Sequence, residues 1–344
     1  MTPGLKVLSP GLHTTVQDLG RIGYQSIGVP VSGALDSFGL RLANALVGNP
    51  QGMAALEILV SGPILEVAAD SARLALVGTG ASLGVRGEHP RVVAAGQSVT
   101  VPRGDVVQIA LGRQSACCYL AVEGGIAVPK ILGSASTYAR AALGGLNGRA
   151  LQRGDILPLV LWCASERTEL RAAAPPPAAA DRPSRIVLGP QQKNFRKEAF
   201  ATLLDAEFRV SKDTDRMGMR LDGPPLRHRR GWDIVSDAIA TGSIQVPGSG
   251  QPIVLLADHQ TTGGYPKIAT VISADLPSLG QCRPGDPLRF VLVELEAAED
   301  ICREAEREFA KLVGAIEPAP SEIELDIESL YGANLISGVT AGFK

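Results

Sequence analysis

Short apolar runs separated by glycine and proline are the feature that most constrains the fold of this chain. In its first half, β-like runs recur about every ten residues, at residues 74–77, 98–101, 106–109, 119–122 and 156–161. The 344 residues include 39 glycines and 24 prolines, which interrupt helices and favour turns. The pattern predicts a mainly β protein built from barrels or sandwiches.

The second half repeats this organisation after a proline-rich boundary. Residues 172–183 carry Pro175-Pro176-Pro177 among alanines and have no apolar periodicity, so we expect a linker there. Strand-like runs then follow at residues 234–236, 243–246, 253–257, 268–272 and 288–293. We therefore expect two tandem β-barrel domains, residues 1–171 and 184–293, followed by a C-terminal segment, residues 294–344.

A few helices are expected among the strands. One spans residues 37–47, with Asp36 as its N-cap and Gly48-Asn49 at its end. Another lies near residues 195–203. A third covers residues 294–316, with Phe309 at the centre of an apolar face, and we expect it to pack against the second barrel or a partner. Residues 317–344 are predicted to form a loosely docked tail.

Composition excludes several classes of function. A formal net charge of −2 gives no reason to expect nucleic acid as a partner, and no apolar run approaches the length of a membrane span. The five cysteines and four histidines lack metal-ligand spacing, so we expect no metal site. There is neither a P-loop nor a Gly-x-Ser-x-Gly elbow. Without a signal peptide, a reducing cytoplasm is the expected location.

The densest group of chemically capable side chains lies in residues 258–266, in the expected loop between two strands. The catalytic candidates are Asp258, Gln260, Thr261 and Thr262, and the binding candidates are Gly263, Gly264 and Tyr265. The paired glycines can take backbone angles closed to other residues, and without Cβ atoms they let a ligand approach the main chain. The alternative is a tight turn whose threonines satisfy their own backbone. His259 is the general-base candidate by position, or else a structural histidine.

Further polar candidates are embedded in glycine-rich or apolar surroundings. They are Gln17, Asp18, Arg21, Asp36, Gln191, Asp215, Arg216 and Gln245. The alternative makes Asp18 a turn former, Arg21 its ion-pair partner and Asp36 only a helix cap. Gln245 lies in an apolar strand, where an unpaired buried amide costs about 1–3 kcal/mol. It is therefore either a ligand contact or part of an internal network.

Taken in order, these segments resemble the family formed by the C subunits of 5-oxoprolinase, also known as biotin-dependent carboxyltransferase or allophanate hydrolase subunit 2 proteins. The resemblance spans residues 7–293 and rests on Thr14-Thr15-Val16-Gln17-Asp18-Leu19-Gly20-Arg21, Gly28-Val29-Pro30, Ser32-Gly33-Ala34, Asp36, Leu42-Ala43-Asn44, Gly124-Gly125-Ile126, Leu132-Gly133-Ser134, Ser136-Thr137, Gly189-Pro190-Gln191, Asp215-Arg216-Met217-Gly218, Gln245-Val246-Pro247 and the loop 258–266. It implies two cyclophilin-like β-barrel domains.

The resemblance also implies work within a larger assembly. In bacterial 5-oxoprolinase, an allophanate hydrolase subunit 1-like protein and a LamB/YcsF-like subunit join this family's member to open 5-oxoproline to glutamate with ATP. Our leading hypothesis is such a subunit, with ATP bound by the complex or by this chain. The alternatives are carboxyl transfer from carboxybiotin to urea or a similar amide, and a non-catalytic regulator that binds a sensor-kinase inhibitor. An exposed helix at residues 294–316 would suit that regulator.

Covalent biotin is not expected on this chain. A biotinyl lysine lies in a Met-Lys-Met run, and the four methionines, at positions 1, 53, 217 and 219, flank no lysine. In the leading hypothesis, main-chain N–H groups of Gly263-Gly264 and the threonine hydroxyls stabilise an oxyanion. Gln245 and Gln260 read the substrate amide or carboxylate, Arg216 binds a phosphate or carboxylate, and Asp258 positions water.

Overall fold

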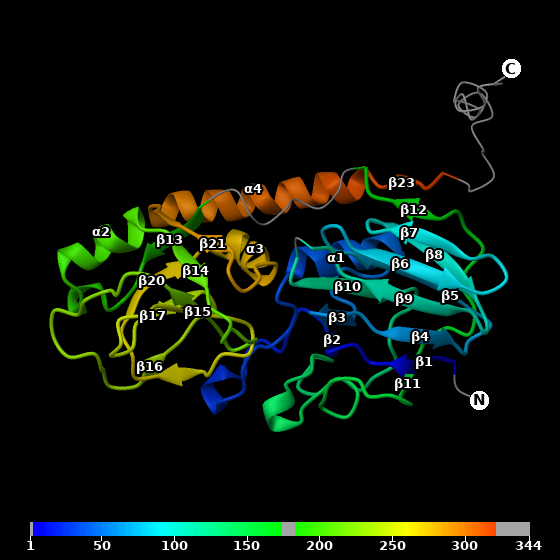
Figure 1. The fold of residues 1–344 in the computed structure, drawn as a ribbon, viewed down its shortest axis with the longest axis horizontal. Coiled ribbons are helices and arrows are strands. Elements are labelled where there is room, and N and C mark those ends of the chain that lie inside the picture. Colours follow the sequence, from blue (N-terminus) through cyan, green and yellow to red (C-terminus); the bar gives the residue numbers. More distant parts are fainter. Residues whose placement is uncertain (1–2, 114, 174–182, 321–344) are drawn as a thin grey trace, which may run out of the picture.

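Two β-rich lobes lie side by side and are bridged along one side by a long helix (Figure 1). The computed structural model describes residues 3–113, 115–173 and 183–320. Most of the expected linker and the tail from residue 321 onward lie outside the described residues. The expectation of a mainly β fold with tandem barrels, short helices and a C-terminal helix is confirmed.

The first lobe is formed by two mainly antiparallel sheets around one core. One sheet has the order β11-β1-β4-β9-β6-β7 and the other β2-β3-β10-β5-β8-β12-β23. Their strands are β1 (Gly4–Ser9), β2 (His13–Gln17), β3 (Ala55–Leu59), β4 (Ile64–Val67), β5 (Ser71–Val77), β6 (Ser82–Arg86), β7 (Arg91–Ala94), β8 (Gln97–Pro102), β9 (Val106–Ala110), β10 (Cys117–Val122), β11 (Ile156–Pro158), β12 (Leu170–Arg171) and β23 (Glu317–Pro318).

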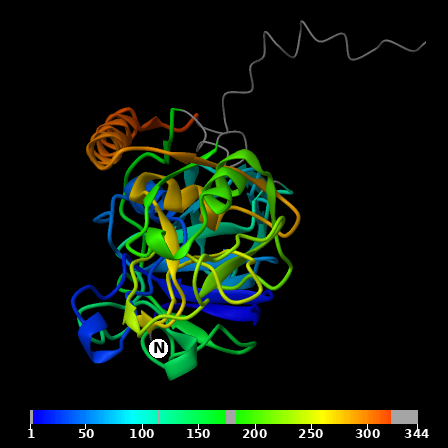
Figure 2. The ribbon, with the colours of Figure 1, turned by 90° about the vertical axis from the view of Figure 1, so that its left-hand side faces the viewer.

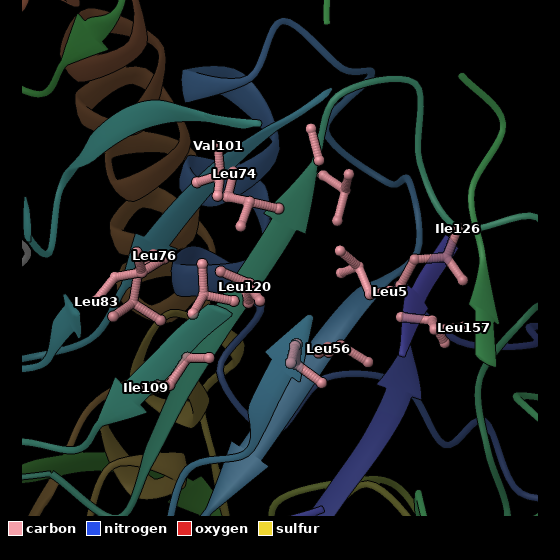
Figure 3. Packing of buried hydrophobic residues seen from close by; sticks show 14 of the residues in the cluster. Leu5, Leu56, Leu74, Leu76, Leu83, Val101, Ile109, Leu120, Ile126 and Leu157 are labelled. Atoms are coloured by element: carbon pink, nitrogen blue, oxygen red, sulfur yellow. The ribbon is translucent and has the colours of Figure 1, made fainter. Parts of the chain in front are cut away.

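Leucine, isoleucine and valine side chains from both sheets fill this core. Leu56, Leu74 and Leu120 of one sheet face Leu5 and Ile109 of the other (Figure 3). β10 is buried along its whole length, because its inner face joins the core and its outer face is covered by α1 (Ser37–Leu46). A strand covered on both faces reads as a continuous apolar run, as the sequence showed.

The second lobe is one strongly curved sheet. Its order is β21-β14-β15-β18-β17-β20-β13-β22, and a two-stranded ribbon of β16 and β19 lies beside it. The strands are β13 (Ser184–Leu188), β14 (Phe208–Val210), β15 (Gly218–Asp222), β16 (Asp237–Ala238), β17 (Ser243–Gln245), β18 (Ile253–Leu255), β19 (Thr262–Gly263), β20 (Lys267–Val271), β21 (Pro287–Leu288) and β22 (Phe290–Leu292). Only Arg289 separates β21 from β22 although they lie at opposite edges, so the sheet curls into a nearly closed barrel.

Local signals place the helices as expected. The Asp36 side chain caps α1 by accepting a hydrogen bond of 2.9 Å from the Gly39 N–H. The second lobe carries α2 (Lys197–Asp205) and α3 (Leu276–Gly280), and short 3₁₀ turns occur at η1 (Gln25–Ile27), η2 (Ala139–Ala141), η3 (Gln192–Asn194) and η4 (Ser273–Asp275).

The C-terminal helix α4 (Leu295–Gly314) connects the two lobes instead of covering the second barrel alone. Its Phe309 packs edge-on against Phe38 of α1, with ring centroids 5.1 Å apart, and the Arg41 guanidinium lies 3.9 Å from the Phe309 ring centroid. Beyond α4, β23 pairs with β12 of the first lobe. The apolar face of the helix is therefore partly buried within the chain, while most of its other side chains remain exposed.

Main-chain hydrogen bonds also join the lobes directly. The Ser32 N–H donates to the Ala257 carbonyl (3.0 Å), and the Ala116 N–H donates to the Gln281 carbonyl (3.0 Å). In the turned view, α4 lies on the side opposite η1 and η2 (Figure 2). None of the helices in the described part of the chain combines the length and apolar character that crossing a bilayer requires.

Candidate functional site

A cavity of about 290 Å³ opens between the two lobes. This volume is close to the lower end of the range of small-molecule sites, about 300 Å³. The first lobe and the second lobe both contribute to its lining, which consists of His13, Thr15, Gln17, Leu59, Val60, Thr137, Ala139, Arg140, Thr214, Asp215, Arg216, Met217 and Asp258. The cavity thus gathers four of the predicted site residues: Gln17, Asp215, Arg216 and Asp258.

A buried ion-pair network centred on Arg216 forms one wall. Its Nε donates to Asp258 Oδ2 (2.8 Å) and its Nη2 to Asp258 Oδ1 (3.1 Å), a bidentate pair within the second lobe. Nη1 donates to the Glu57 carboxylate of the first lobe, and Nη2 also donates to the Gly33 carbonyl (2.6 Å). Arg216 therefore holds the two lobes together at the cavity.

The network continues into the first lobe through Glu57, which is fully buried on β3. Glu57 Oε2 accepts from the Tyr119 hydroxyl (2.6 Å) and from the Leu35 N–H (2.8 Å). Burial alone would lower the pKa of Arg216, but the negative charges of Glu57 and Asp258 outweigh burial and raise that pKa above its usual value. The guanidinium is consequently a permanent positive charge.

Three polar atoms of cavity-lining residues have no partner among the described residues. They are His13 Nδ1, Gln17 Oε1 and Thr214 Oγ1. Buried polar atoms in folded proteins are nearly always hydrogen-bonded, and leaving one unpaired costs about 1–3 kcal/mol. Each of these atoms is itself buried, so a ligand atom in the cavity would reach it only after the surrounding side chains had moved.

The cavity rim includes a strained turn. Val60 has a φ of 67°, and the Ser61 N–H donates to the Leu59 carbonyl at 2.8 Å. This is a γ-turn of the rare hand, and a β-branched residue is a conspicuous outlier in that conformation. Such strain persists only where the surroundings impose it, and it concentrates at functional sites.

Asp18 and Arg21 have mainly structural contacts. Asp18 accepts hydrogen bonds from the hydroxyls of Ser134 and Ser136 and from the N–H groups of Ala135 (2.7 Å) and Gly20 (2.8 Å). Burial would raise its pKa, but these hydrogen bonds lower it below the usual value. Arg21 donates to the Ser136 carbonyl, and the described structure contains no Asp18–Arg21 ion pair. Asp18 is thus the turn former of the alternative interpretation, whereas the ion pair with Arg21 in that same interpretation is absent from the described residues.

The loop 258–266 does not present one common face. Asp258 lines the cavity, whereas Thr262 and Gly263 form β19 and pair with Ala238 and Asp237 of β16. Neither Gly263 nor Gly264 has a positive φ, so neither uses the backbone freedom that glycine offers at these positions. A Cβ at Gly263 would lie 2.8 Å from both Gln245 Nε2 and Ile239 Cδ1, so the ends of these two side chains would have to shift to admit it.

His259 is a buried structural residue in this arrangement. Its Nδ1 lies 2.6 Å from the Gln260 carbonyl oxygen, to which it must donate, and its Nε2 lies 3.0 Å from Thr241 Oγ1. Burial lowers the pKa of the imidazole, although the Gln260 carbonyl and Asp258 oppose this. Both ring nitrogens are occupied by protein groups, which agrees with the structural interpretation.

A second polar cluster lies under the β16–β19 ribbon. Gln191 Nε2 donates to Asp237 Oδ2 (3.0 Å), and the buried Lys267 Nζ donates to the same oxygen (2.8 Å). Gln260 Nε2 reaches Gln245 Oε1 at 3.4 Å. Gln245 is therefore part of an internal network, although its Nε2 has no partner among the described residues. Tyr265, half-exposed at 38%, packs against Trp232.

Comparisons with known proteins identify the family. The profile of the carboxyltransferase domain, subdomain A and B, matches residues 27–292. The chain is 36% identical to the C subunit of 5-oxoprolinase from Escherichia coli K12, over 90% of this chain and 97% of that protein. This chain belongs to the carboxyltransferase domain A and B family.

Other members of the carboxyltransferase family are much longer proteins. The urea amidolyase of Lachancea kluyveri is 32% identical over 86% of this chain, which spans 17% of that enzyme. The solved structure of Kluyveromyces lactis urea carboxylase superimposes with a TM-score of 0.81 at 30% identity, covering 93% of this chain and 30% of that one. The two-lobed fold is thus shared with a segment of a carboxylase.

Three residues that organise this site are not among those predicted from the sequence. Glu57, Lys267 and Thr137 all make contacts that organise the two polar regions. Glu57 and Lys267 carry a charge inside otherwise apolar strands, and a buried charge requires a partner. That charge was the available signal. Thr137 offers no comparable one, since its role depends on a main-chain carbonyl.

Proposed function

We propose that this chain is the C subunit of an ATP-dependent 5-oxoprolinase, which opens 5-oxoproline to glutamate. The observation that carries the proposal is the nearly end-to-end match with the corresponding E. coli protein, covering 90% of this chain and 97% of that protein. By contrast, the chain spans only 17% of a urea amidolyase. The match therefore extends over nearly all of a known 5-oxoprolinase subunit but over only a segment of a urea amidolyase.

The proposed reaction begins by weakening amide resonance in the lactam ring. ATP phosphorylates the ring carbonyl oxygen, which releases ADP while the ring N–H loses its proton. Water then adds to that carbon, and cleavage of the C–N bond gives an acyl phosphate with a free amine. A second water hydrolyses the acyl phosphate to glutamate and phosphate. Fixed donors near the developing oxyanion contribute about 3–4 kcal/mol each. An allophanate hydrolase subunit 1-like protein and a LamB/YcsF-like subunit would complete the assembly, and the nucleotide site belongs to the complex or to this chain. The free cysteines fit a cytoplasmic location.

We place the lactam in the cavity between the lobes. Asp258 would position water there, held in place by Arg216. Gln260, Thr261 and Thr262 follow along the same loop but do not line this cavity, so a role as donors would require them to turn toward it. Polar residues of both lobes, among them Thr15 and Thr214, line that cavity. Both lobes must be assembled for such a site to be complete.

Reconstitution tests the proposal directly. The chain is mixed with its two expected partner subunits, and 5-oxoproline-dependent ATP hydrolysis and glutamate formation are measured. Glutamate formation that requires this chain supports the proposal, and its absence with all three subunits present refutes it. In the same assay, full activity of a Gln260→Ala, Thr261→Ala variant would remove the loop from the mechanism.

Arg140 at the cavity rim is expected to recognise the substrate carboxylate. It makes an exposed ion pair with Asp215 at 3.4 Å, and such a pair is weak enough to be exchanged for a ligand carboxylate. Arg140→Ala should therefore raise the KM for 5-oxoproline about tenfold, the loss of one charge-assisted hydrogen bond, while kcat changes little. Steady-state kinetics check this, with Arg153→Ala, another exposed arginine, as the control. An unchanged KM would place the carboxylate elsewhere.

Carboxyl transfer remains the second candidate, favoured by the match to the carboxyltransferase domain and by the likeness to K. lactis urea carboxylase. In that case the chain would act on biotin carried by another protein. Transfer of labelled carboxylate from a carboxybiotin carrier to urea, dependent on this chain, would establish it. Failure of that transfer alongside turnover of 5-oxoproline would exclude it.

A further inference from the structure

We propose that an apolar hollow with a basic rim, on the second lobe, is the docking surface for a protein partner that presents an apolar side chain flanked by acidic residues. The hollow lies against α2, at the end of the second lobe that is remote from the first lobe (Figure 1). It is therefore separate from the cavity between the lobes. The inference rests on the proposed function only for the identity of the partner, which is another subunit of the oxoprolinase assembly.

The hollow has a volume of about 180 Å³ and lies between α2 and the strands β13 and β22. Within the described part of the chain, its lining is apolar apart from Gln192 of η3. Leu188 and Leu292 line it and are nevertheless 43% and 37% exposed. Lys197 begins α2 one turn before Phe200, another lining residue, so positive charge lies beside the apolar surface. Exposed apolar side chains gathered around a hollow are typical of an interaction site.

The basic rim is formed by two segments that lie side by side. A β-bridge between Phe195 and His228 aligns residues 193–197 with residues 227–230. The cations of the two segments are all exposed, and none of them has an ion-pair partner in the part of the chain that the structure describes: Lys193, Arg196, Lys197, Arg227, Arg229 and Arg230.

The pairing of the two segments sets like charges against each other. The Arg196 N–H donates to the Arg227 carbonyl (3.3 Å), so these two arginines lie opposite one another beside the bridge. Like charges directly opposite in an antiparallel pair destabilise the fold. The whole chain has a formal net charge of −2, so the repulsion is a local feature and does not follow from a basic composition. An acidic partner would relieve this repulsion when it binds.

The combination of the two features decides the class of partner. An apolar centre surrounded by a charged rim is the usual anatomy of a protein–protein interface. Nucleic acid or free phosphate would match the cations but would leave the apolar hollow uncovered. A protein segment with an apolar anchor between acidic residues matches both the hollow and the rim.

Charge reversal at the rim tests the proposal on the full-length chain. Binding of the Arg196→Glu, Arg229→Glu variant to each purified partner subunit is measured by biolayer interferometry at low and at physiological salt. We expect the affinity for one subunit to fall about tenfold or more at low salt, and the remaining binding to depend less on salt. Lys130→Glu, Arg153→Glu is the matched control, because it changes the net charge equally at exposed positions of the first lobe, and it should bind as the wild type does.

The same variant separates docking from folding. Because it removes the repulsion between Arg196 and Arg227, it should unfold at no lower urea concentration than the wild type, although it binds more weakly. A merely structural role of these arginines would instead lower the unfolding midpoint.

A charge placed in the hollow tests its apolar part. Leu188→Asp should weaken binding of the same subunit about tenfold or more, because an aspartate there cannot be covered by an apolar side chain without losing its hydration. Val92→Asp is the control, since Val92 is an apolar residue of β7 that is 76% exposed on the first lobe. It should leave the affinity unchanged.

The outcomes are distinguishable. Absence of wild-type binding to either subunit, or unchanged affinity of the rim variant or of Leu188→Asp, overturns the proposal. Rim-dependent binding of a DNA duplex, or rim-dependent self-association of the chain, overturns it when neither subunit binds. Glutamate formation by the wild-type complex together with unchanged binding of both variants overturns this inference and leaves the proposed function standing. Binding that both variants weaken, without glutamate formation by the complex, supports the docking surface and refutes the proposed function.

Discussion

Replacing Arg216 by alanine should lower the free energy of unfolding by about 3–5 kcal/mol, the usual cost of removing one partner from a buried ion pair. The variant leaves Glu57, which is fully buried, and Asp258 without their counter-charge. It also removes the hydrogen bond to the Gly33 carbonyl across the interface between the lobes. The substitution should therefore weaken the contact between the lobes and also destabilise each lobe.

The two tryptophans make this measurable, because Trp162 lies in the first lobe and Trp232 in the second. Urea unfolding followed by fluorescence of single-tryptophan variants, Trp162→Phe and Trp232→Phe, reports each lobe separately. With Arg216→Ala, both midpoints should fall and the two transitions should move apart. Arg289→Ala is the matched control, since its pair with Glu207 is exposed and worth about 1 kcal/mol at most. An Arg216→Ala variant as stable as this control would contradict the structural role of the network.

The features of this fold that the sequence predicts correctly depend on residues close together in the chain. The α1 helix begins at Ser37 because Asp36 caps an N–H only three residues away, and such a cap is visible in the sequence. The alternation of short apolar runs with glycine likewise predicted two β-rich lobes. Both features depend on residues within one turn of a helix or one strand.

The site depends on contacts that no local pattern contains. Glu57 and Arg216 are 159 positions apart, so their pairing follows from how the two lobes meet. The composition of residues 258–266 predicted a polar site, yet different residues of that loop turn toward different surroundings. The glycines of this loop show the same limit, because a sequence does not reveal whether a glycine adopts a positive φ, and neither Gly263 nor Gly264 does so.

The stability of this interface should also depend on pH through Asp36. Complete burial raises the pKa of Asp36 from its usual 3.8 to about 6, against the opposing effect of hydrogen bonds from Gly39, Gln281 and Phe38, and the charge of Glu57 adds to the rise. Gln281 comes from the second lobe, so this carboxyl lies where the lobes meet.

A raised pKa means that the folded chain binds a proton more tightly than the unfolded chain does. Between about pH 4 and pH 6, Asp36 of the folded chain keeps a proton that the unfolded chain has already lost. The free energy of unfolding therefore falls as the pH rises through this range. The full cost, about 3 kcal/mol, is present above about pH 7, where the buried carboxylate is charged.

Comparison with Asp36→Asn isolates this contribution. Asp18, whose pKa is lowered, makes stability rise with pH, but it does so equally in the wild type and in the variant, so its effect cancels in the difference. Urea unfolding from pH 4.5 to pH 8 should show the wild type losing stability relative to Asp36→Asn as pH rises. In one of its orientations the asparagine also presents an N–H donor to Gln281, where aspartate presents an acceptor. This separates the two curves of unfolding free energy by an amount that does not depend on pH. Only the change in their separation with pH measures the ionisation, so parallel curves would mean that Asp36 titrates normally in the folded protein.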